Sequence, residues 1–260
     1  MPWLTLRYEQ IANLRAALRH ANKSPNTINT TLAAIRGVLK VGFLSGQFPA
    51  LEWERIQAID RVAGKPLSAG AGRQLRSAEI NRLFKACQRE ANPIQGIRDA
   101  AILALLAYAG LRRSEVTTLQ VGDYSSRSGQ LFVREGKGQR QRELRLPLAA
   151  RAYLRQWLNY RGNKPGVLFG QLNKQGGYDV SQPISAHHIY GILQRRAKEA
   201  GIAHCSPHDL RRTFVTRLLE QGVDFNTASQ LAGHEHIQTT ALYDRREVKA
   251  QRQAMANFTL

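Results

Sequence analysis

The sequence predicts a mainly α-helical protein with a small antiparallel β-sheet, which is an α+β fold. Most of the chain repeats apolar residues at helical spacing, whereas residues 130–147 alternate with the two-residue period of paired strands. Residues 64–73 are rich in Gly, Pro, Ser and Ala, which is typical of a linker. We therefore expect a helical domain at residues 1–63, a larger domain at 74–246 and a C-terminal tail at 247–260.

The composition is that of a folded protein with a polyanionic partner. Of the 260 residues, 43% are hydrophobic, which is enough to build a packed core. Lys and Arg number 38 against 19 Asp and Glu, which gives a net charge of +19 and a pI near 10.8. Nucleic acid is the commonest partner for such an excess; the alternatives are a ribosomal protein or a protein of anionic membrane surfaces.

The cysteines and the apolar runs indicate a reducing compartment. Cys87 and Cys205 are too few to build a disulfide framework. Residues 1–10 lack the apolar core of a signal peptide, and the longest apolar run, residues 100–109, is too short to span a bilayer. We therefore expect a cytoplasmic protein without a membrane segment.

Two helices are predicted in the N-terminal domain. The first covers residues 4–20, and its apolar face consists of Leu6, Ile11, Leu14, Ala17 and Leu18. The second follows the capping residue Ser24, has Pro25 in its first turn and ends at Gly42 or Gly46. Its apolar face consists of Ile28, Leu32, Ile35 and Leu39.

The opposite face of the second helix is polar. It consists of Asn26, Asn29, Thr30, Arg36 and Lys40. Such a face is either solvated or lies along a DNA groove, where amides and basic groups meet bases and phosphates. The sequence of this helix leaves both interpretations open.

The larger domain should begin with a helix at residues 77–90, capped by Ser77, with Ile80, Leu83, Phe84 and Cys87 inward. Residues 97–109 are apolar nearly all round, so they should form a central buried helix.

Gly110 is a natural end for this buried helix. Arg112 and Arg113 should therefore emerge where it ends. Ser114 can cap the next helix, with Glu115 in its first turn.

A β-hairpin is predicted at residues 130–147, with Lys137 near its tip. The basic residues around that lysine are Arg134, Arg140, Arg142 and Arg145. On the pattern alone, Lys137 could equally be a solvated side chain. Further helices are expected at 149–160 and at 187–200, with a short strand at 167–169 between them.

The stretch at residues 206–246 concentrates the side chains that suit attack on phosphate. A helix follows Pro207, and His208 shares one of its faces with both Arg211 and Arg212, so the spacing leaves the choice between them open. The next helix starts at Asp224 and stops at Gly233, and it is followed by His234 and Tyr243. Tyrosine can form covalent intermediates, arginine binds phosphate oxygens in pairs, and histidine moves protons near neutral pH.

A zinc site is not expected. His204, Cys205 and His208 lie close together in sequence, but no fourth ligand follows at a standard spacing. The sequence assigns no role to His187 or His188.

Several of these segments together resemble the tyrosine recombinase (phage integrase) family. In the family's order, they are residues 109–116 (AGLRRSEV), 136–138 (GKG), 207–213 (PHDLRRT), 231–234 (LAGH) and 239–243 (TTALY). Each segment is common by itself, and their combination in this order is hard to obtain by chance. The resemblance implies a helical DNA-clamping domain followed by the recombinase catalytic domain.

The resemblance also implies a role for each site residue. Tyr243 would attack a scissile DNA phosphodiester, with His208 as the proton acceptor and Lys137 as the general acid for the leaving 5′-oxygen. Arg112 and Arg211 would hold the non-bridging oxygens, and His234 would donate to one of them. Residues expected to contact DNA are Asn26, Asn29, Thr30, Arg36, Lys40, Arg140 and Arg212.

The family chemistry implies double-stranded DNA as the partner and no cofactor, metal ion or ATP. We expect a homotetramer on two DNA sites, a monomer or weak oligomer without DNA, and association with the bacterial nucleoid. The tail at 247–260 could dock on a neighbouring subunit. The N-terminal domain is short for the family, so it is either minimal or lacks N-terminal residues. The alternatives are a strand-passing enzyme like a type IB topoisomerase and a catalytically silent DNA-binding protein.

Overall fold

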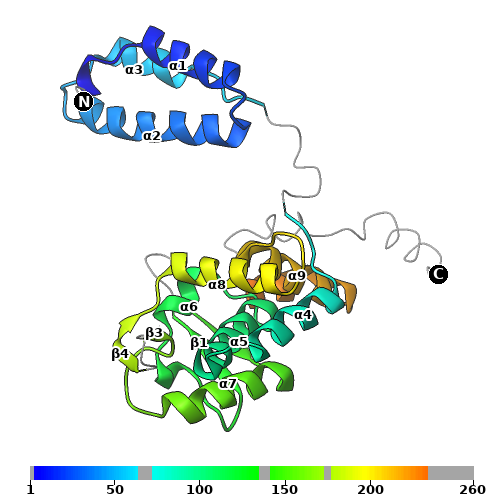
Figure 1. The fold of residues 1–260 in the computed structure, drawn as a ribbon. Coiled ribbons are helices and arrows are strands. Elements are labelled where there is room, and N and C mark those ends of the chain that lie inside the picture. The colour runs from blue at the N-terminus through cyan, green and yellow to red at the C-terminus, as the bar shows by residue number, and fades with distance from the viewer. Residues whose placement is uncertain (1–2, 64–71, 135–140, 173–176, 234–260) are drawn as a thin grey trace, which may run out of the picture. The chain divides into compact units, whose positions relative to one another are not determined.

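The computed structural model describes residues 3–63, 72–134, 141–172 and 177–233. The chain forms two compact units, Met1–Ser68 and Ala69–Leu260 (Figure 1). Each unit has a hydrophobic core of its own. Both units are mainly helical, and the second adds short antiparallel sheets, so the predicted α+β fold is confirmed. Across the described ranges, no helix combines the length and the apolarity needed to cross a bilayer.

The N-terminal unit packs its helices around one apolar cluster. The helices are α1 (Tyr8–His20), α2 (Pro25–Leu44) and α3 (Ala50–Gln57). As predicted, the Ser24 hydroxyl caps α2 by accepting a hydrogen bond from the Thr27 N–H at 3.1 Å. The core includes the predicted α2 face together with Ile11, Trp53 and Ile56.

The first helix differs from its prediction. It begins at Tyr8, after a short 3₁₀ turn at Trp3–Thr5. Leu14, which was expected inside, is 38% exposed, because α1 meets the core along a narrow line through Ile11 and Leu18.

The C-terminal unit is organised around α5 (Pro93–Tyr108), whose residues from Ala100 to Leu106 are almost inaccessible to solvent. The helices that surround it include α4 (Ser77–Gln88), α7 (Leu148–Arg161), α8 (Ala186–Glu199) and α9 (Pro207–Glu220) (Figure 1). The described part of this unit also contains the shorter helices α6 (Arg113–Thr118) and α10 (Phe225–Ala232) and a 3₁₀ turn at Val121–Asp123. The predicted buried helix is therefore confirmed as the centre of the core.

The predicted hairpin is present as β1 (Gln130–Val133) and β2 (Arg142–Arg145), which pair antiparallel with Leu131 opposite Leu144. The strand predicted at 167–169 is wrong. The carbonyls of Val167 and Leu168 accept hydrogen bonds from side chains, among them the Tyr178 hydroxyl at 3.0 Å, instead of forming a ladder. A second small sheet follows, formed by β3 (Gly170–Leu172) and β4 (Tyr178–Pro183).

Acidic side chains, and not the predicted serines, cap α4 and α6. Ser77 lies inside α4, and the Glu79 carboxylate accepts the Arg76 N–H at 2.9 Å. Ser114 lies inside α6, and the Glu115 carboxylate accepts the Arg112 N–H at 2.8 Å. An acid at the third helical position reaches back to the chain before the helix, which a serine in the first turn cannot do.

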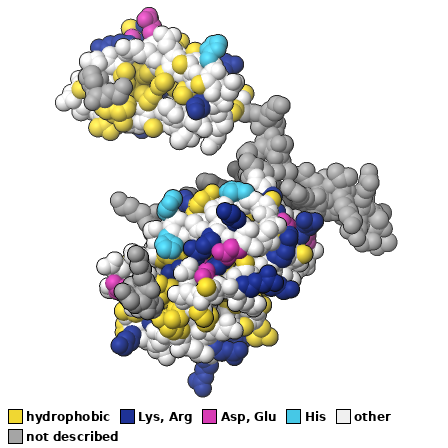
Figure 2. Space-filling view, viewed as in Figure 1, with side chains coloured by type: hydrophobic (Ala, Val, Ile, Leu, Met, Phe, Trp, Pro, Cys, Tyr) yellow, Lys and Arg dark blue, Asp and Glu magenta, His cyan; other side chains and the backbone are white. Residues whose placement is uncertain are grey.

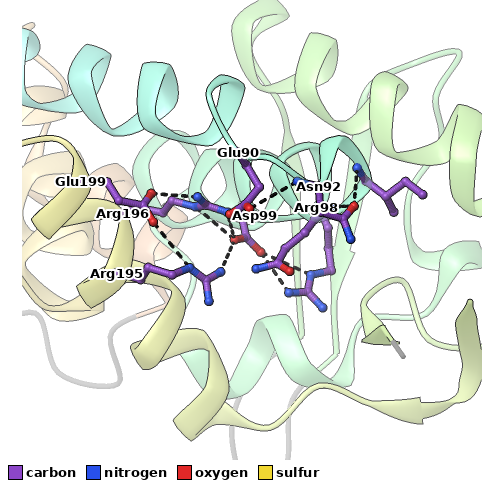
Figure 3. A network of polar contacts seen from close by, with 9 residues as sticks. Glu90, Asn92, Arg98, Asp99, Arg195, Arg196 and Glu199 are labelled. Atoms are coloured by element: carbon purple, nitrogen blue, oxygen red, sulfur yellow. Dashed lines mark hydrogen bonds and ion pairs between the residues drawn. The ribbon is translucent and has the colours of Figure 1, made fainter. Parts of the chain in front are cut away.

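A buried ionic network joins α5 to α8 (Figure 3). Asp99 is fully buried and accepts hydrogen bonds from Arg98, Arg195 and Arg196. Arg196 also pairs with Glu90 at 2.6 Å and with Glu199 at 2.8 Å. Buried charges persist where they are paired and hydrogen-bonded, so this network ties the central helix to α8.

Candidate active site

The first turn of α9 is held in place by reciprocal hydrogen bonds. The Ser206 hydroxyl accepts the Asp209 N–H at 3.2 Å, and the Asp209 carboxylate accepts the Ser206 N–H at 2.7 Å. The same carboxylate accepts the Arg73 N–H at 2.8 Å. His208 lies within this fixed turn, so its backbone has little freedom.

His208 is exposed, which leaves its imidazole accessible. Desolvation by the surrounding protein lowers the pKa of His208 below its ordinary value of 6.5, and the positive charge of Arg211 lowers it further. Arg212 and Arg112 act in the same direction, against Asp209. The neutral imidazole is therefore the favoured form at neutral pH, and it can accept a proton.

Arg211 lies one turn after His208 and is only 3% exposed. Its Nη1 donates a hydrogen bond to the Gly110 carbonyl at 2.7 Å. Gly110 has a φ of +60°, and a Cβ there would collide with the ring of Phe214 on α9. The glycine thus allows α9 to lie against the corner between α5 and α6, which places Arg211 next to the Arg112 segment.

Arg212 points to a different part of the unit. Its Nη1 donates to the Gly72 carbonyl at 2.7 Å, and the side chain is 2% exposed. The structure therefore separates two arginines that the helical spacing left equivalent. Because Arg212 bonds the Gly72 carbonyl instead of the Gly110 corner, its DNA contact stays a prediction.

Arg112 stands at the start of α6, with its side chain 30% exposed. Its Nη1 donates to Glu115 at 2.7 Å, and its Nη2 donates to the Gly233 carbonyl at the end of α10. Arg142 also binds Glu115, with both carboxylate oxygens at 3.0 and 2.9 Å, and donates to the Leu231 carbonyl at 3.1 Å. This cluster joins α6, β2 and α10.

Glu115 is the anionic centre of that cluster. Its burial alone favours the neutral acid, but the hydrogen bonds and charge of Arg142, followed by those of Arg112, hold the pKa of Glu115 below its ordinary value. Both of its oxygens are occupied by guanidinium groups. The carboxylate therefore orients the two arginines.

The structure describes three of the six predicted catalytic residues: Arg112, His208 and Arg211. The other three, Lys137, His234 and Tyr243, lie outside the described residues, as does Arg140. The described neighbours of these positions are Gly233, which precedes His234, and the strands β1 and β2, which flank the Lys137 segment.

Two of the predicted DNA-contacting residues of α2 make hydrogen bonds within the N-terminal unit. Asn29 exchanges two hydrogen bonds with the Val62 backbone, at 3.0 and 2.9 Å. Arg36 donates to the carbonyls of Ile56 and Ile59, just at and beyond the end of α3. The sequence pattern missed this because α3 was not predicted. Asn26, Thr30 and Lys40 are exposed, and their DNA contacts stay predictions.

Sequence reasoning also missed the roles of Glu115 and Arg142. Glu115 carried one local signal, its position three residues after Arg112, where an acid can close a capping box. Arg142 carried none, because its partners lie 27 and 89 residues away.

The residues near His204 have structural partners. The imidazole of His204 bonds the Tyr190 hydroxyl at 3.0 Å, and burial raises the pKa of the Cys205 thiol to about 11. In the part of the chain that the structure describes, no group of three or more histidine, cysteine or acidic side chains could hold a metal ion.

Positively charged side chains are common both on the surface of the C-terminal unit and at the site. Figure 2 shows Lys and Arg side chains spread over the viewed face of the C-terminal unit, with a few carboxylates among them. At the site, two arginines and a neutral imidazole come from one corner of the fold. Such an arrangement suits a phosphate group that gains negative charge during a reaction.

Comparison with known proteins identifies relatives of this fold. Residues 73–249 match the model of the phage integrase family. Tyrosine recombinase XerA of Pyrococcus furiosus is 28% identical, covering 94% of this chain and 78% of that protein. Tyrosine recombinase XerC of Alcanivorax borkumensis is 30% identical, covering 93% of this chain and 76% of that protein.

Solved structures share the same architecture. A crystal structure of XerA recombinase superposes with a TM-score of 0.59 at 22% identity, over 97% of this chain and 92% of that one. The Tn1549 transposon integrase, solved in complex with transposon right end DNA, superposes with a TM-score of 0.73 at 17% identity, over 98% and 87%. Because the family match covers more than half of the sequence, the chain belongs to the phage integrase family and is a tyrosine recombinase.

Proposed function

We propose that this site-specific DNA recombinase cuts each strand through attack of the Tyr243 hydroxyl on the scissile phosphate. The products are a 3′-phosphotyrosyl bond and a free 5′-hydroxyl. The observation that best supports this chemistry is the hydrogen bond from Arg211 to Gly110, which brings the Arg211 helix to the Arg112 corner. His208 lies one turn earlier on the same helix.

The first step of the proposed reaction requires a proton acceptor, because an unperturbed tyrosine has a pKa of about 10. His208 takes this role, which its lowered pKa supports. Arg112 and Arg211 bind the non-bridging oxygens as negative charge builds on them. Each pre-positioned donor of this kind typically contributes about 10²–10³ in rate.

The departing 5′-oxygen needs a proton, and Lys137 supplies it. His234 donates a hydrogen bond to a non-bridging oxygen. Its place in the site is supported by the preceding residue, Gly233, whose carbonyl accepts a hydrogen bond from Arg112. Rejoining reverses the sequence: a 5′-hydroxyl attacks the phosphotyrosyl bond, the tyrosine leaves, and no ATP is consumed.

The proposed partner is double-stranded DNA, bound by a homotetramer that joins two sites, with a monomer or weak oligomer in its absence. Solved relatives include a lambda integrase dimer bound to a COC′ core site and XerH bound to a palindromic difH substrate. In the proposal, the N-terminal helices close on the duplex through the linker at 64–73, and the tail at 247–260 docks on a neighbouring subunit. The complex works at the nucleoid in the cytoplasm.

The alternatives considered from the sequence are not favoured. Relatives that match along most of the chain are named as tyrosine recombinases. The sequence retains Arg112, His208 and Arg211, whereas a DNA-binding protein that has lost catalysis should lack some of these side chains.

Trapping of the covalent adduct tests the proposal. The protein is incubated with its own flanking DNA, denatured, and assayed for protein joined to a 3′ end. Wild-type protein should form the adduct, and Tyr243→Phe should bind DNA with unchanged affinity but form none. An adduct that persists in Tyr243→Phe would refute the assignment of the nucleophile. In the wild-type reaction, sequencing of the cleavage points would identify the DNA site.

A further inference from the structure

Arg142 contacts two separate elements from its position on β2. Its Nη1 and Nη2 donate to the two oxygens of Glu115 at 3.0 and 2.9 Å, and its Nε donates to the Leu231 carbonyl at 3.1 Å. The side chain is 8% exposed, so these bonds form away from water. A planar guanidinium with fixed donor directions can make such a set, whereas the point charge of an ammonium cannot.

The last turn of α10 is shaped around this guanidinium. Gly233 ends the helix with a φ of +66°, and a Cβ at that position would lie 2.5 Å from Nη1 of Arg142. Only glycine therefore lets the backbone pass this close to Arg142. The same glycine accepts a hydrogen bond from Arg112 through its carbonyl.

Arg142 thus holds in place two groups that accept hydrogen bonds from Arg112. Arg112 donates to Glu115 and to Gly233. Arg142 binds both oxygens of Glu115 and lies against the turn that contains Gly233. Arg142 need not touch a phosphate to influence the reaction, because it determines where the acceptors of Arg112 lie.

We propose that Arg142 is a positioning residue, which orients the Arg112 guanidinium toward the scissile phosphate by fixing Glu115 and the last turn of α10. The inference rests on the proposed function of Arg112. It extends that function to a side chain on β2, the strand that follows the Lys137 segment. On this strand Arg142 is paired with Val133 of β1. A displacement of this strand would then change the orientation of the Arg112 guanidinium.

The test compares Arg142→Lys with Arg145→Lys. Both residues belong to β2, and both substitutions keep the charge, but Arg145 is exposed. DNA affinity should therefore be the same in both variants. Single-turnover adduct formation is measured on DNA with a normal scissile phosphate and on DNA with a methylphosphonate there, which removes the charge that Arg112 stabilises.

On normal DNA, Arg142→Lys should slow adduct formation about 10–100-fold, the size seen when residues that orient metal ligands are removed. On the methylphosphonate, most of that difference should disappear, because a neutral centre depends less on Arg112. Arg145→Lys should match the wild type on both substrates. Equal losses of Arg142→Lys on the two substrates, or no loss, would overturn the positioning role.

A second measurement does not depend on catalysis. In DNA-free protein, amide hydrogen exchange over Phe225–Gly233 should become faster in Arg142→Lys and stay unchanged in Arg145→Lys, while exchange of α5 stays protected in both. Unchanged exchange in α10 would overturn the proposal even if DNA were cleaved. A wild-type protein that forms no adduct would instead refute the proposed function, and exchange would still decide whether Arg142 holds the turn.

Discussion

Arg211 donates a 2.7 Å hydrogen bond from Nη1 to the carbonyl of Gly110, a residue 101 positions earlier in the chain. This bond connects the helix of His208 to the corner from which Arg112 emerges. Because Gly110 carries no side chain, Phe214 can lie against it and the two segments can approach. The hydrogen bond therefore ties Arg211 to the backbone that leads into the Arg112 segment.

Replacement of Arg211 by lysine should therefore impair catalysis. Lysine keeps the charge but loses the planar fork, so we expect adduct formation to fall by about 10²–10³-fold, as for the loss of one oriented donor. Single-turnover assays with saturating DNA measure this. Arg217→Lys is the control, since Arg217 lies on the same helix and bonds the Leu75 carbonyl and the Ser77 hydroxyl. A similar loss in both variants would point to damage of α9.

The pH dependence of cleavage should report His208. Its pKa is lowered by desolvation and by Arg211, so the neutral base predominates above the lowered value. The rate of adduct formation should rise with pH to a plateau, with the midpoint of the rise below 6.5, the value of an ordinary histidine. His208→Gln should remove this rise, and His187→Gln, a change on α8, should retain it. A rise centred above pH 6.5 would contradict the assignment of His208 as the base.

The same histidine should make stability depend on pH. A group whose pKa is lower in the folded state binds fewer protons when folded, so the free energy of unfolding increases with pH. The contribution of His208 is fully present above pH 6.5 and is lost as the pH falls through its lowered folded pKa. Urea denaturation between pH 5 and pH 7 should show a smaller pH dependence in His208→Gln than in the wild type.

Gly233→Ala should cost stability and activity together. Its φ of +66° disfavours any residue with a Cβ, and the added atom would press on Arg142. We expect a loss of about 1 kcal/mol or more in the free energy of unfolding. Gly201→Ala is the matched control, because Gly201 has a φ of +58° and open space around it. The control should lose stability through backbone strain while its rate of adduct formation stays normal.

Asp99→Asn should strongly destabilise the C-terminal unit. The change removes the carboxylate that buried Arg98 binds and one of the three carboxylates that Arg196 binds, and breaking a buried pair typically costs about 3–5 kcal/mol. Urea denaturation measures the loss in the free energy of unfolding, and amide hydrogen exchange of α5 provides a second measurement. Glu199→Gln alters an outer member that is 39% exposed and should cost about 1 kcal/mol or less. Equal effects would show that the burial of Asp99 is unimportant.

Much of the secondary structure was predictable because its signals are local. The Ser24 cap, the apolar face of α2, the buried run of α5 and the alternation of the hairpin all lie within a few residues. The capping acids Glu79 and Glu115 were also within local reach, but the serines beside them gave the stronger apparent signal. The strand predicted at 167–169 failed because side chains from elsewhere took its carbonyls.

The sequence by itself determined most of the helices, the hairpin and the supply of arginine, histidine and tyrosine for phosphate chemistry, because periodicity and residue type are local properties. Tertiary structure alone decided that Arg211 meets the Arg112 corner while Arg212 turns to Gly72. It also decided that Arg142 supports Glu115 and the end of α10. These outcomes depend on contacts between segments far apart in the chain, and helical spacing carries no information about which distant segment packs against which face.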